Sequence, residues 1–411
     1  MRFSIIEKLK QCFDEIPEND NRSKIFPKEF ITTLILNFTR DTHRRTLAGL
    51  RRNLINSTNK VIARSTFWKR LGTRRLSVIL SQLIGRLIAE SAKNLCVPNT
   101  LLEKLGVEGI FLLDSTSITL PKNAKKDFPA TRIAPAAIKW HSLWDLTVGQ
   151  LKWFELTAGT EHDSKYFPKF ATLKNKLIIF DLGYFNLNMF QELSKQSYFL
   201  SRLRGHIRAE FYQIVSGLPR KFEGTKLYLE TLPKRENIID ALVLLGENGD
   251  FIERVVGFWD FQENKYHWYV TNLSVDAELI YPLYRLRWQL ELVYKSVKSS
   301  MRMADIGSSD KSIILNFQLI SIAAILLTTS LRQTMNSELV DSQRLAVSSQ
   351  RLAILMVHLG KLFQNYFLGK QQTLAQLKQK VKLFINEVFD PNLGHRDTSL
   401  MKVFKMIQYQ T

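Results

Sequence analysis

The chain has 411 residues, 45% of them hydrophobic and 11% aromatic, with 58 Lys and Arg against 38 Asp and Glu. This composition is that of an ordinary globular protein, and the length is too great for a single hydrophobic core, so two to four domains are expected. The net charge of +20 favours an anionic partner, most commonly nucleic acid. Over half of that excess lies in residues 1–100, which hold 19 Lys and Arg and 8 Asp and Glu.

Neither the cysteines nor the hydropathy indicates secretion or a membrane. Cys12 and Cys96 give neither a disulfide framework nor a metal-ligand spacing, which is compatible with a reducing cytoplasm. The N-terminus is charged throughout, so no signal peptide is apparent. The apolar stretch Ile313–Leu331 contains Asn316 and Gln318, which predicts a buried helix rather than a membrane span.

Residues 1–100 are predicted to form a helical DNA-binding region. Apolar positions recur there with a helical period over Ile5–Ile16, Pro27–Phe38, Thr42–Leu54 and Arg75–Ala92.

A short basic helix is predicted within this region, with Ser65 as a suitable N-cap and Gly72 as a suitable stop. Its apolar anchors are Phe67, Trp68 and Leu71, and the cations around them are Arg64, Lys69, Arg70, Arg74 and Arg75. Such a helix suits docking on DNA in the manner of a helix-turn-helix, where cations contact phosphates. The alternative is a solvated basic face of a helix packed on its own domain.

Residues 101–204 are predicted to form the first part of an α/β core. Apolar runs that contain or end in Asp predict buried strands within Gly109–Pro121 and Lys176–Asn186. The other predicted elements are a β-hairpin over 139–160 with Gly149 and Gln150 at its turn, helices over Asp163–Leu173 and Leu187–Gln196, and a strand over Tyr198–Arg204.

The next region, 205–275, contains short alternating runs broken by Gly and Asn or Asp turns, which predicts a β-rich insertion. The core is predicted to resume over 276–335, which includes a helix at Ser312–Arg332. The last region, 336–411, returns to helices over Ser342–Phe367 and Thr373–Val388, and it is a candidate for dimerisation.

The segment Glu278–Arg302 is predicted to be an amphipathic helix with an unusual polar face. At ~100° per residue, four polar side chains fall within about 60° of one another: Tyr284, Arg287, Glu291 and Lys298. A separate stripe of Leu and Val forms its apolar side. A single carboxylate among cations is unusual on the exposed face of a solvated helix. Glu291 is therefore predicted to face a partner that the surrounding positive charges hold.

Three carboxylates are candidates for metal binding. Asp114 and Asp181 each follow a β-rich apolar run, and open α/β folds place reactive groups at strand ends, although a single such Asp is more often a cap or turn residue. Glu291 adds the third carboxylate. Three converging carboxylates can hold two divalent cations ~4 Å apart for phosphoryl transfer, and oxygen ligands suit Mg²⁺ or Mn²⁺.

The helical polar face also carries a resemblance. Tyr284, Arg287, Glu291 and Lys298 match, at every spacing, the Y-R-E-K signature of DDE transposases of the bacterial insertion-sequence-four group. The segments DSTSITLP, TAGTEHD, DLGYFN and YVTNL agree with it, and the resemblance covers residues 60–360. It implies an α/β, ribonuclease-H-like core, a mixed sheet flanked by helices, with a β-rich insertion and helical terminal regions. It also implies a cytoplasmic, nucleoid-associated bacterial enzyme of cut-and-paste type.

The resemblance implies roles for individual residues. Asp114, Asp181 and Glu291 would be the catalytic triad and would bind the two Mg²⁺ or Mn²⁺ ions. The DNA-binding residues of the polar helix would be Tyr284, Arg287 and Lys298, which suits the affinity of Arg and Lys for phosphate.

Some family members stack a flipped base on an aromatic residue. Trp268 is the nearest match and Trp288 a second candidate, and for both the alternative is packing in the core. Secondary candidates for the site are Lys139, His141, His162 and Asp163. Lys139 and His141 lie in a predicted strand and are candidates to face DNA, and the alternative is that they are surface residues of that strand. Asp163 is predicted to be a helix N-cap.

The sequence therefore predicts a DNA transposase that binds inverted-repeat ends and target DNA, pairs two ends as a homodimer, and catalyses metal-dependent cleavage and strand transfer without a membrane partner. Two alternatives stay open. One is a ribonuclease-H-like nuclease that hydrolyses DNA without joining it, and the other is a non-catalytic DNA-binding protein derived from a transposase.

Overall fold

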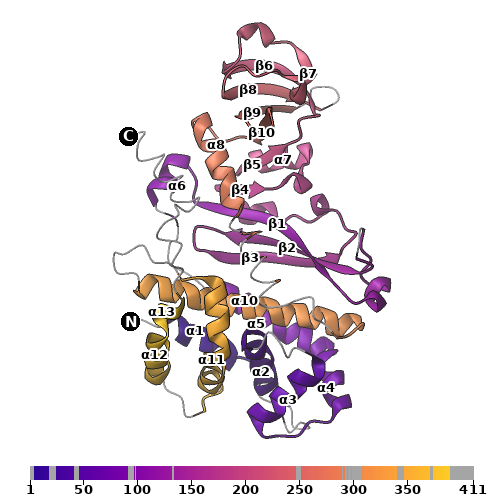
Figure 1. The fold of residues 1–411 in the computed structure, drawn as a ribbon, viewed down its shortest axis with the longest axis vertical. Helices are drawn as coiled ribbons and strands as arrows, with labels where there is room; N and C mark the ends of the chain where they lie inside the picture. Colours follow the sequence, from indigo (N-terminus) through magenta and orange to yellow (C-terminus); the bar gives the residue numbers. More distant parts are fainter. Residues whose placement is uncertain are drawn as a thin grey trace.

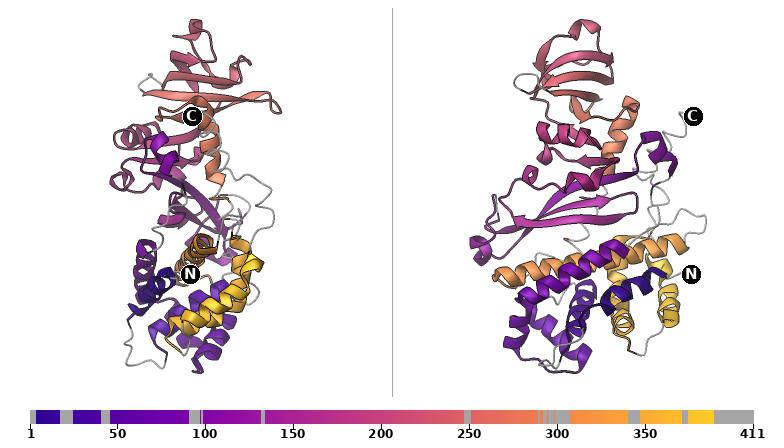
Figure 2. Two further views of the ribbon diagram at one scale, coloured as in Figure 1. Left: turned by 90° about the vertical axis from the view of Figure 1, so that its left-hand side faces the viewer. Right: turned by 180° about the vertical axis from the view of Figure 1, so that it is seen from behind.

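A computed structural model describes residues 4–17, 25–40, 46–90, 97, 99–131, 134–246, 251–288, 290, 291, 294, 298, 307–339, 347–370 and 374–388. Within these residues the protein is elongated, with a helical body at one end and a long sheet extending away from it (Figures 1 and 2). The helices of the body are α1 (Ser4–Asp14), α2 (Pro27–Arg40), α3 (Leu47–Thr58), α4 (Arg64–Leu71), α5 (Arg74–Glu90), α10 (Lys311–Leu339), α11 (Ser349–Phe367), α12 (Leu374–Leu383) and α13 (Ile385–Val388).

The helical body joins the two ends of the chain, because α2 and α5 pack against α10 and α2 also packs against α11. Asn316 on α10 is fully buried, donates to the carbonyl of Leu71 at 2.7 Å and accepts from the hydroxyl of Ser77 at 2.7 Å. Gln364 on α11 donates to the hydroxyl of Thr33 on α2 at 2.8 Å. Since buried polar groups need partners, these bonds align the C-terminal helices with the N-terminal ones.

Helix α10 lies in the core of this body. Its stretch Lys311–Arg332 is the one segment of the described residues that is long and apolar enough to cross a membrane, but 83% of its apolar window is buried inside the protein. The predicted buried helix is therefore confirmed, and Asn316 and Gln318 are both fully buried.

The helices predicted near the N-terminus are confirmed within the described residues. Helix α3 begins at Leu47, where the hydroxyl of Thr46 accepts a hydrogen bond from the N–H of Gly49 at 3.0 Å and caps the helix, and residues 42–45 of the prediction lie outside the described part of the chain. Helix α4 begins at Arg64, so Ser65 is not its N-cap, whereas Gly72 follows its last residue as predicted.

The core of the sheet follows the chain from β1 to β5. These strands are β1 (Gly109–Thr119), β2 (Ala137–Asp145), β3 (Gln150–Ala158), β4 (Lys176–Phe180) and β5 (Tyr198–Leu203), and α6 (Asn99–Leu105) and α7 (Leu187–Ser194) lie beside them. Their order is β3-β2-β1-β4-β5; β1 is antiparallel to β2 and parallel to β4, and β4 is parallel to β5. This is the mixed sheet of a ribonuclease-H-like core, as predicted.

Both faces of β1 over 110–113 and of β4 over 177–180 are buried, which explains the uninterrupted apolar runs of these two strands. In β1, Ile110 and Leu112 join the cluster that also contains the helices, here called the helix-side cluster. Phe111 and Leu113 join a second cluster on the other face, here called the opposite cluster. Alternate side chains of a strand point to opposite faces, so these memberships show which face each later residue of β1 occupies.

The helix predicted over Asp163–Leu173 is wrong. The structure has two short 3₁₀ turns instead, at Asp163–Lys165 and at Phe170–Leu173. Pro168 lies between them, and proline lacks the N–H of an α-helix and disfavours helical backbone in the residue before it. The side chain of His162, rather than that of Asp163, caps the first turn.

The β-rich region is confirmed, but it does not form a separate sheet. Its strands are β6 (Arg208–Ser216), β7 (Lys226–Tyr228), β8 (Ile238–Leu245), β9 (Phe251–Asp260) and β10 (Lys265–Thr271). Strand β10 is antiparallel to β5, from Trp268 opposite Leu203 to Thr271 opposite Leu200, so the insertion continues the sheet of the core in the order β5-β10-β9-β8-β6-β7.

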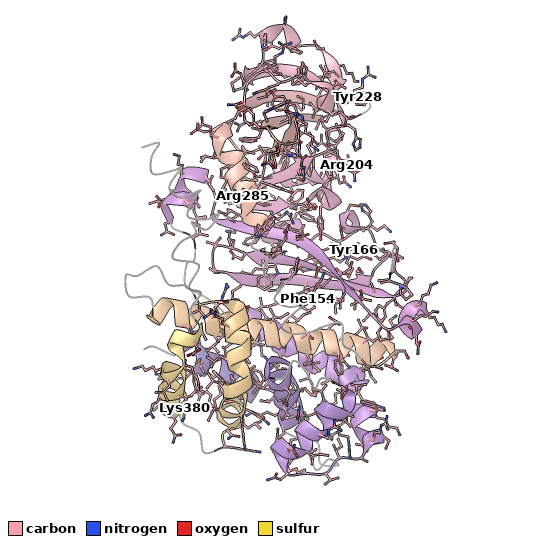
Figure 3. The ribbon with its side chains drawn as sticks, in the orientation of Figure 1. Phe154, Tyr166, Arg204, Tyr228, Arg285 and Lys380 are labelled. Carbon is pink, nitrogen blue, oxygen red and sulfur yellow. The ribbon has the colours of Figure 1, made fainter. Side chains whose placement is uncertain are left out.

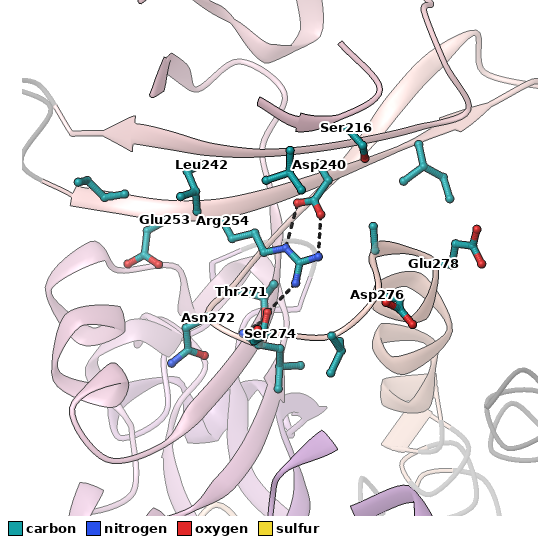
Figure 4. Close-up of a pocket in the computed structure, with 16 residues that line it drawn as sticks. Ser216, Asp240, Leu242, Glu253, Arg254, Thr271, Asn272, Ser274, Asp276 and Glu278 are labelled. Atoms are coloured by element: carbon teal, nitrogen blue, oxygen red, sulfur yellow. Dashed lines mark hydrogen bonds and ion pairs between the residues drawn. The ribbon is translucent and has the colours of Figure 1, made fainter. Parts of the chain in front are cut away.

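A buried ion pair connects the insertion to the segment that precedes α8 (Ala277–Tyr284). Arg254 on β9 binds both carboxylate oxygens of Asp240 on β8, at 2.9 and 2.7 Å, and donates to the carbonyl of Leu273 at 2.6 Å. These residues line a cavity of about 890 Å³ between the insertion and the start of α8 (Figure 4). The insertion thereby fixes the point at which α8 begins.

The predicted helix Glu278–Arg302 is present but not uniform. Helix α8 ends at Tyr284, a 3₁₀ turn spans Arg285–Arg287, and the described residues beyond it, among them Glu291 and Lys298, are again helical. The remaining residues of the prediction lie outside the described part of the chain.

Candidate active site

Asp114 and Asp181 lie on neighbouring parallel strands. Leu113 of β1 is paired with Phe180 of β4, so the two Asp residues follow the last pair of that ladder. Asp181 follows β4, as predicted, whereas Asp114 lies within β1, because β1 continues its pairing with β2 after β4 has ended. Asp114 lies two residues after Leu112, and Asp181 lies two residues after Ile179. Because alternate side chains point to the same face, both Asp side chains lie on the helix-side face with Leu112 and Ile179.

The helical segment that begins with α8 places its polar side chains, among them Tyr284 and Arg287, beside the two Asp residues. Its Leu283, Leu286 and Leu290 are buried in the helix-side cluster, and α8 packs against β5, β8 and β9 while the 3₁₀ turn contacts β1. Figure 1 shows α8 lying along this side of the sheet. The apolar stripe thus directs the opposite, polar line of the segment towards the two Asp residues.

Two side chains of the segment join the three carboxylates. The guanidinium of Arg287 donates to Asp114 Oδ2 at 2.8 Å and to Glu291 Oε1 at 2.6 Å. The hydroxyl of Tyr284 donates to Asp181 Oδ1 at 3.0 Å, and the guanidinium of Arg287 lies 5.8 Å from the Tyr284 ring. Asp114, Asp181 and Glu291, which are 177 residues apart at their extremes, therefore meet around these two residues.

Tyr294 is a part of this site that sequence reasoning missed. It is buried, and its hydroxyl donates to the backbone carbonyl of Asp114 at 2.9 Å and lies 2.6 Å from the hydroxyl of Ser142 on β2. Trp144 in turn donates to Ser142 at 3.0 Å. Its position three residues after Glu291, close to the same helical face, was the available signal.

The electrostatics of the site are dominated by burial. The pKa of Asp114 is raised to about 6, mainly by burial and also by the charge of Asp181, whereas Arg287 and the N–H of Ser115 favour the charged form. Burial also raises the pKa of Tyr284, so its hydroxyl is a donor to Asp181 and not a phenolate. The positive charge of Arg287 therefore offsets the burial of Asp114 only in part.

The donor set fits Mg²⁺ or Mn²⁺. All three groups are carboxylates, the ligands that these cations prefer, and none is fully buried: the side chains of Asp114 and Glu291 are 14% and 39% exposed. A second group with ligand chemistry, Asp260, Glu263 and His267, lies at the β9–β10 hairpin.

The structure separates the two aromatic candidates. Trp268 is 1% exposed and packs on Gly257, where an added Cβ would lie 2.7 Å from its ring, so it is a core residue and not a surface that DNA can reach. Trp288 is 58% exposed at the start of the helix that carries Glu291. Of the two alternatives left open for Trp268, packing is therefore the one observed.

The other predicted DNA-binding residues lie in two places. Lys298 is exposed and interacts electrostatically with Asp114. In the helical body, the side chains of Arg64, Lys69, Arg74 and Arg75 are exposed on and beside α4. Arg70 instead donates to the carbonyl of Ile25 at 2.8 Å and lies over the ring of Phe30, so it holds α4 to the rest of the body.

A ribonuclease-H-like sheet with acidic residues on adjacent strands, completed by an acidic residue on a helix, defines a class of enzymes that transfer phosphoryl groups on nucleic acids. The sequence profile described as transposase DDE domain matches residues 106–327, from just before β1 into α10. The chain belongs to this transposase family, and it is a DNA transposase of the insertion-sequence-four kind.

Two relatives agree with this membership. The chain is 22% identical over 350 residues to the transposase for insertion sequence element IS1151 of Clostridium perfringens. The matched region covers 73% of this chain and 74% of that protein. It is 26% identical over 243 residues to the transposase for insertion sequence element IS231E of Bacillus thuringiensis subsp. finitimus, covering 48% of this chain and 50% of that protein.

Proposed function

We propose that this transposase cleaves DNA at the inverted-repeat ends of its element and joins the exposed 3′-hydroxyl groups to target DNA. The observation that supports this most strongly is the meeting of Asp114, Asp181 and Glu291 around Tyr284 and Arg287. Cleavage and joining are the same phosphoryl transfer with water or a 3′-hydroxyl as the nucleophile, so one set of carboxylates serves both.

In this proposal the three carboxylates hold two Mg²⁺ or Mn²⁺ ions, which would activate the attacking oxygen and stabilise the leaving oxygen. Tyr284 orients Asp181 through its hydrogen bond, and Tyr294 fixes the backbone of Asp114. Arg287 and Lys298 provide the positive charge that binds phosphates on either side of the scissile bond. Arg287 exchanges a carboxylate contact for a phosphate contact as DNA enters.

DNA end recognition is assigned to the basic surface of α4 and the start of α5. Its exposed cations are Arg64, Lys69, Arg74 and Arg75. Phe67 and Leu71 are fully buried beneath it, so the surface is held rigidly on the helical body. Two copies of the chain would each bind one end, which makes a homodimer the smallest complex that can pair two ends.

Replacing these four cations by Gln is expected to weaken end binding by about 10²–10³-fold and to reduce the slope of log K against log salt by about 3, because each phosphate contact releases condensed counterions. Fluorescence anisotropy with a labelled inverted-repeat duplex between 50 and 200 mM salt would measure both. The exposed Lys380 and Lys382 of α12 serve as the control, since Gln there should leave the slope within about 0.5. An unchanged slope in the fourfold variant would place the DNA elsewhere.

A joining assay separates the proposal from its alternatives. A labelled end with a free 3′-hydroxyl, mixed with supercoiled plasmid and Mg²⁺, is expected to give labelled plasmid with a covalently attached end. Cleavage without joined product would indicate a nuclease that only hydrolyses. Binding without cleavage in either Mg²⁺ or Mn²⁺ would indicate a DNA-binding protein without catalysis.

A further inference from the structure

A second charged cluster lies on the opposite face of the sheet from Asp114. Lys139 and His141 of β2 share the side-chain alternation of Leu143, which belongs to the opposite cluster. Asp163 Oδ1 lies 3.2 Å from the Lys139 ammonium and 3.5 Å from His141 Nδ1. Tyr166, labelled beside β1 and β2 in Figure 3, belongs to the same cluster. Its ring stacks on that of His141 with the centroids 4.7 Å apart.

This cluster is packed directly against the turn that follows Asp181. A Cβ added to Gly183 would lie 2.8 Å from Asp163 Oδ2, so the carboxylate occupies the space that a side chain would need. The hydroxyl of Tyr184, the last residue of the turn, lies 3.3 Å from His141 Nδ1, and the Tyr184 side chain is 1% exposed. Both residues after Leu182 are therefore held by the cluster.

The turn transmits this contact to Asp181. The N–H of Tyr184 donates to the carbonyl of Asp181 at 3.0 Å, which closes the turn on the residue that presents the carboxylate. Strand β2 reaches the other carboxylate as well, because His141 is opposite Ser115 and Ser142 is opposite Asp114. The contacts of this cluster therefore support both β1, which carries Asp114, and the turn after β4, which carries Asp181, from the opposite face of the sheet.

The charge balance of the cluster rests on Lys139. Burial lowers the pKa of His141 to about 4, even though Asp163 favours its charged form, so the imidazole is neutral at neutral pH. The Lys139 and Asp163 side chains are 14% and 22% exposed. Asp163 Oδ1 is buried and has no hydrogen bond of good geometry among the described residues, so the ion pair with Lys139 is its main stabilisation. Replacing a buried ion pair by apolar residues is often neutral or stabilising, so packing alone does not require these charges.

We propose that Asp163 is a positioning residue of the transposition reaction: paired with Lys139 and packed against Gly183, it holds the turn Leu182–Tyr184 so that Asp181 stays aligned with Asp114 and Glu291. The proposal rests on the proposed function in that it takes Asp181 to be a metal ligand. Residues that orient the ligands of a metal commonly change metal affinity or activity by 10- to 100-fold when they are altered. Asp163 itself touches none of the three carboxylates in the described contacts.

The test uses Asp163→Asn in the full chain, because Asn keeps the size of the side chain against Gly183 and removes its charge. We expect kcat for cleavage of a labelled end to fall about 10- to 100-fold while KM for the end stays within about two-fold, since DNA binding is untouched. Mn²⁺ binding, followed by the electron paramagnetic resonance signal of free Mn²⁺, is expected to weaken about 10-fold. The matched control is Glu192→Gln, which removes the charge of an exposed ion pair with Lys195 on α7 and should change neither quantity.

A second pair of variants tests the contact with the turn. Gly183→Ala alone is expected to lower kcat to a similar degree, because its Cβ meets the Asp163 carboxylate. In the Asp163→Ala background the same Gly183→Ala change should cost no more than about two-fold, since the carboxylate it meets is gone. Additive losses in the double variant would overturn the proposed contact.

Hydrogen exchange separates the positioning role from the proposed function. In the metal-free protein, Asp163→Asn is expected to speed exchange of the amides of residues 181–185 by about 10-fold, while the amides of β10 stay as in the parent protein. Unchanged exchange together with unchanged Mn²⁺ binding and kcat would overturn the proposal. A different result would contradict the proposed function alone. If exchange speeds up in Asp163→Asn, but Asp181→Asn binds Mn²⁺ as the parent protein does or the parent protein binds none, then Asp181 is not a metal ligand. The support of the turn by Asp163 would still stand in that case.

Discussion

Asp181→Asn is expected to lower DNA cleavage by at least about 10³-fold while end binding stays within about two-fold of that of the parent protein. Asn can still accept the hydrogen bond from Tyr284, so the fold of the site is retained. What is lost is the negative charge that holds a divalent cation. Nicking of a labelled inverted-repeat end in Mg²⁺ measures cleavage, and a mobility shift in Ca²⁺ measures binding without turnover.

Asp114→Asn and Glu291→Gln should behave in the same way, because the three carboxylates act as one unit. Asp260→Asn at the β9–β10 hairpin is the control, since it changes the same chemical group away from Arg287 and Tyr284. Normal nicking by Asp181→Asn would show that the triad is wrongly assigned, whereas loss of nicking in the hairpin variant would point to general damage to the fold.

Arg287→Met is the second variant with a large expected effect, a loss of about 10²–10³-fold in cleavage. This guanidinium bridges Asp114 and Glu291, so its removal leaves two carboxylates without the cation between them and a phosphate without a forked donor. It also removes the charge that lowers the pKa of Asp114, so that pKa should rise. Single-turnover cleavage over a range of Mg²⁺ concentrations would separate weaker metal binding from slower chemistry.

Arg287→Lys provides the comparison for this variant. Lys keeps the positive charge but cannot bind two carboxylates or a phosphate through a planar fork, so it should recover part of the loss and remain at least about 10-fold below the parent protein. If Arg287→Met cleaved within about five-fold of the parent protein, the bridge would be a feature of the protein without DNA and would have no role in the reaction.

Much of this site could be predicted because its residues carry local signals. The Asp residues end or interrupt apolar runs, and the spacing of Tyr284, Arg287 and Glu291 places them on one side of a helix. The contact of Tyr284 and Arg287 with DNA phosphates stays a prediction. The structure adds that the same two side chains contact Asp181, Asp114 and Glu291.

The residues that were missed or misassigned lack a signal of this kind. Tyr294 resembles any buried aromatic residue until Ser142 of β2 is placed beside it, more than 150 positions away. Asp163 was read as a possible helix cap, because helical propensity in its segment gave no weight to Pro168. Trp268 was matched to the base-stacking residue of the family because it lies near the last strand of the insertion. Its burial, which excludes that role, depends on packing against Gly257 of the neighbouring strand.

The sequence by itself determined the class of fold, the family and the basic character of α4, and it singled out the three carboxylates that meet around Tyr284 and Arg287, because periodicity and motif spacing are properties of neighbouring residues. Only the tertiary structure decided that the two terminal regions form one helical body, that the insertion extends the core sheet through β10 and β5, and that Arg287 bridges Asp114 and Glu291. Those features depend on contacts between residues far apart in the chain, and local patterns do not specify which distant surfaces will be complementary.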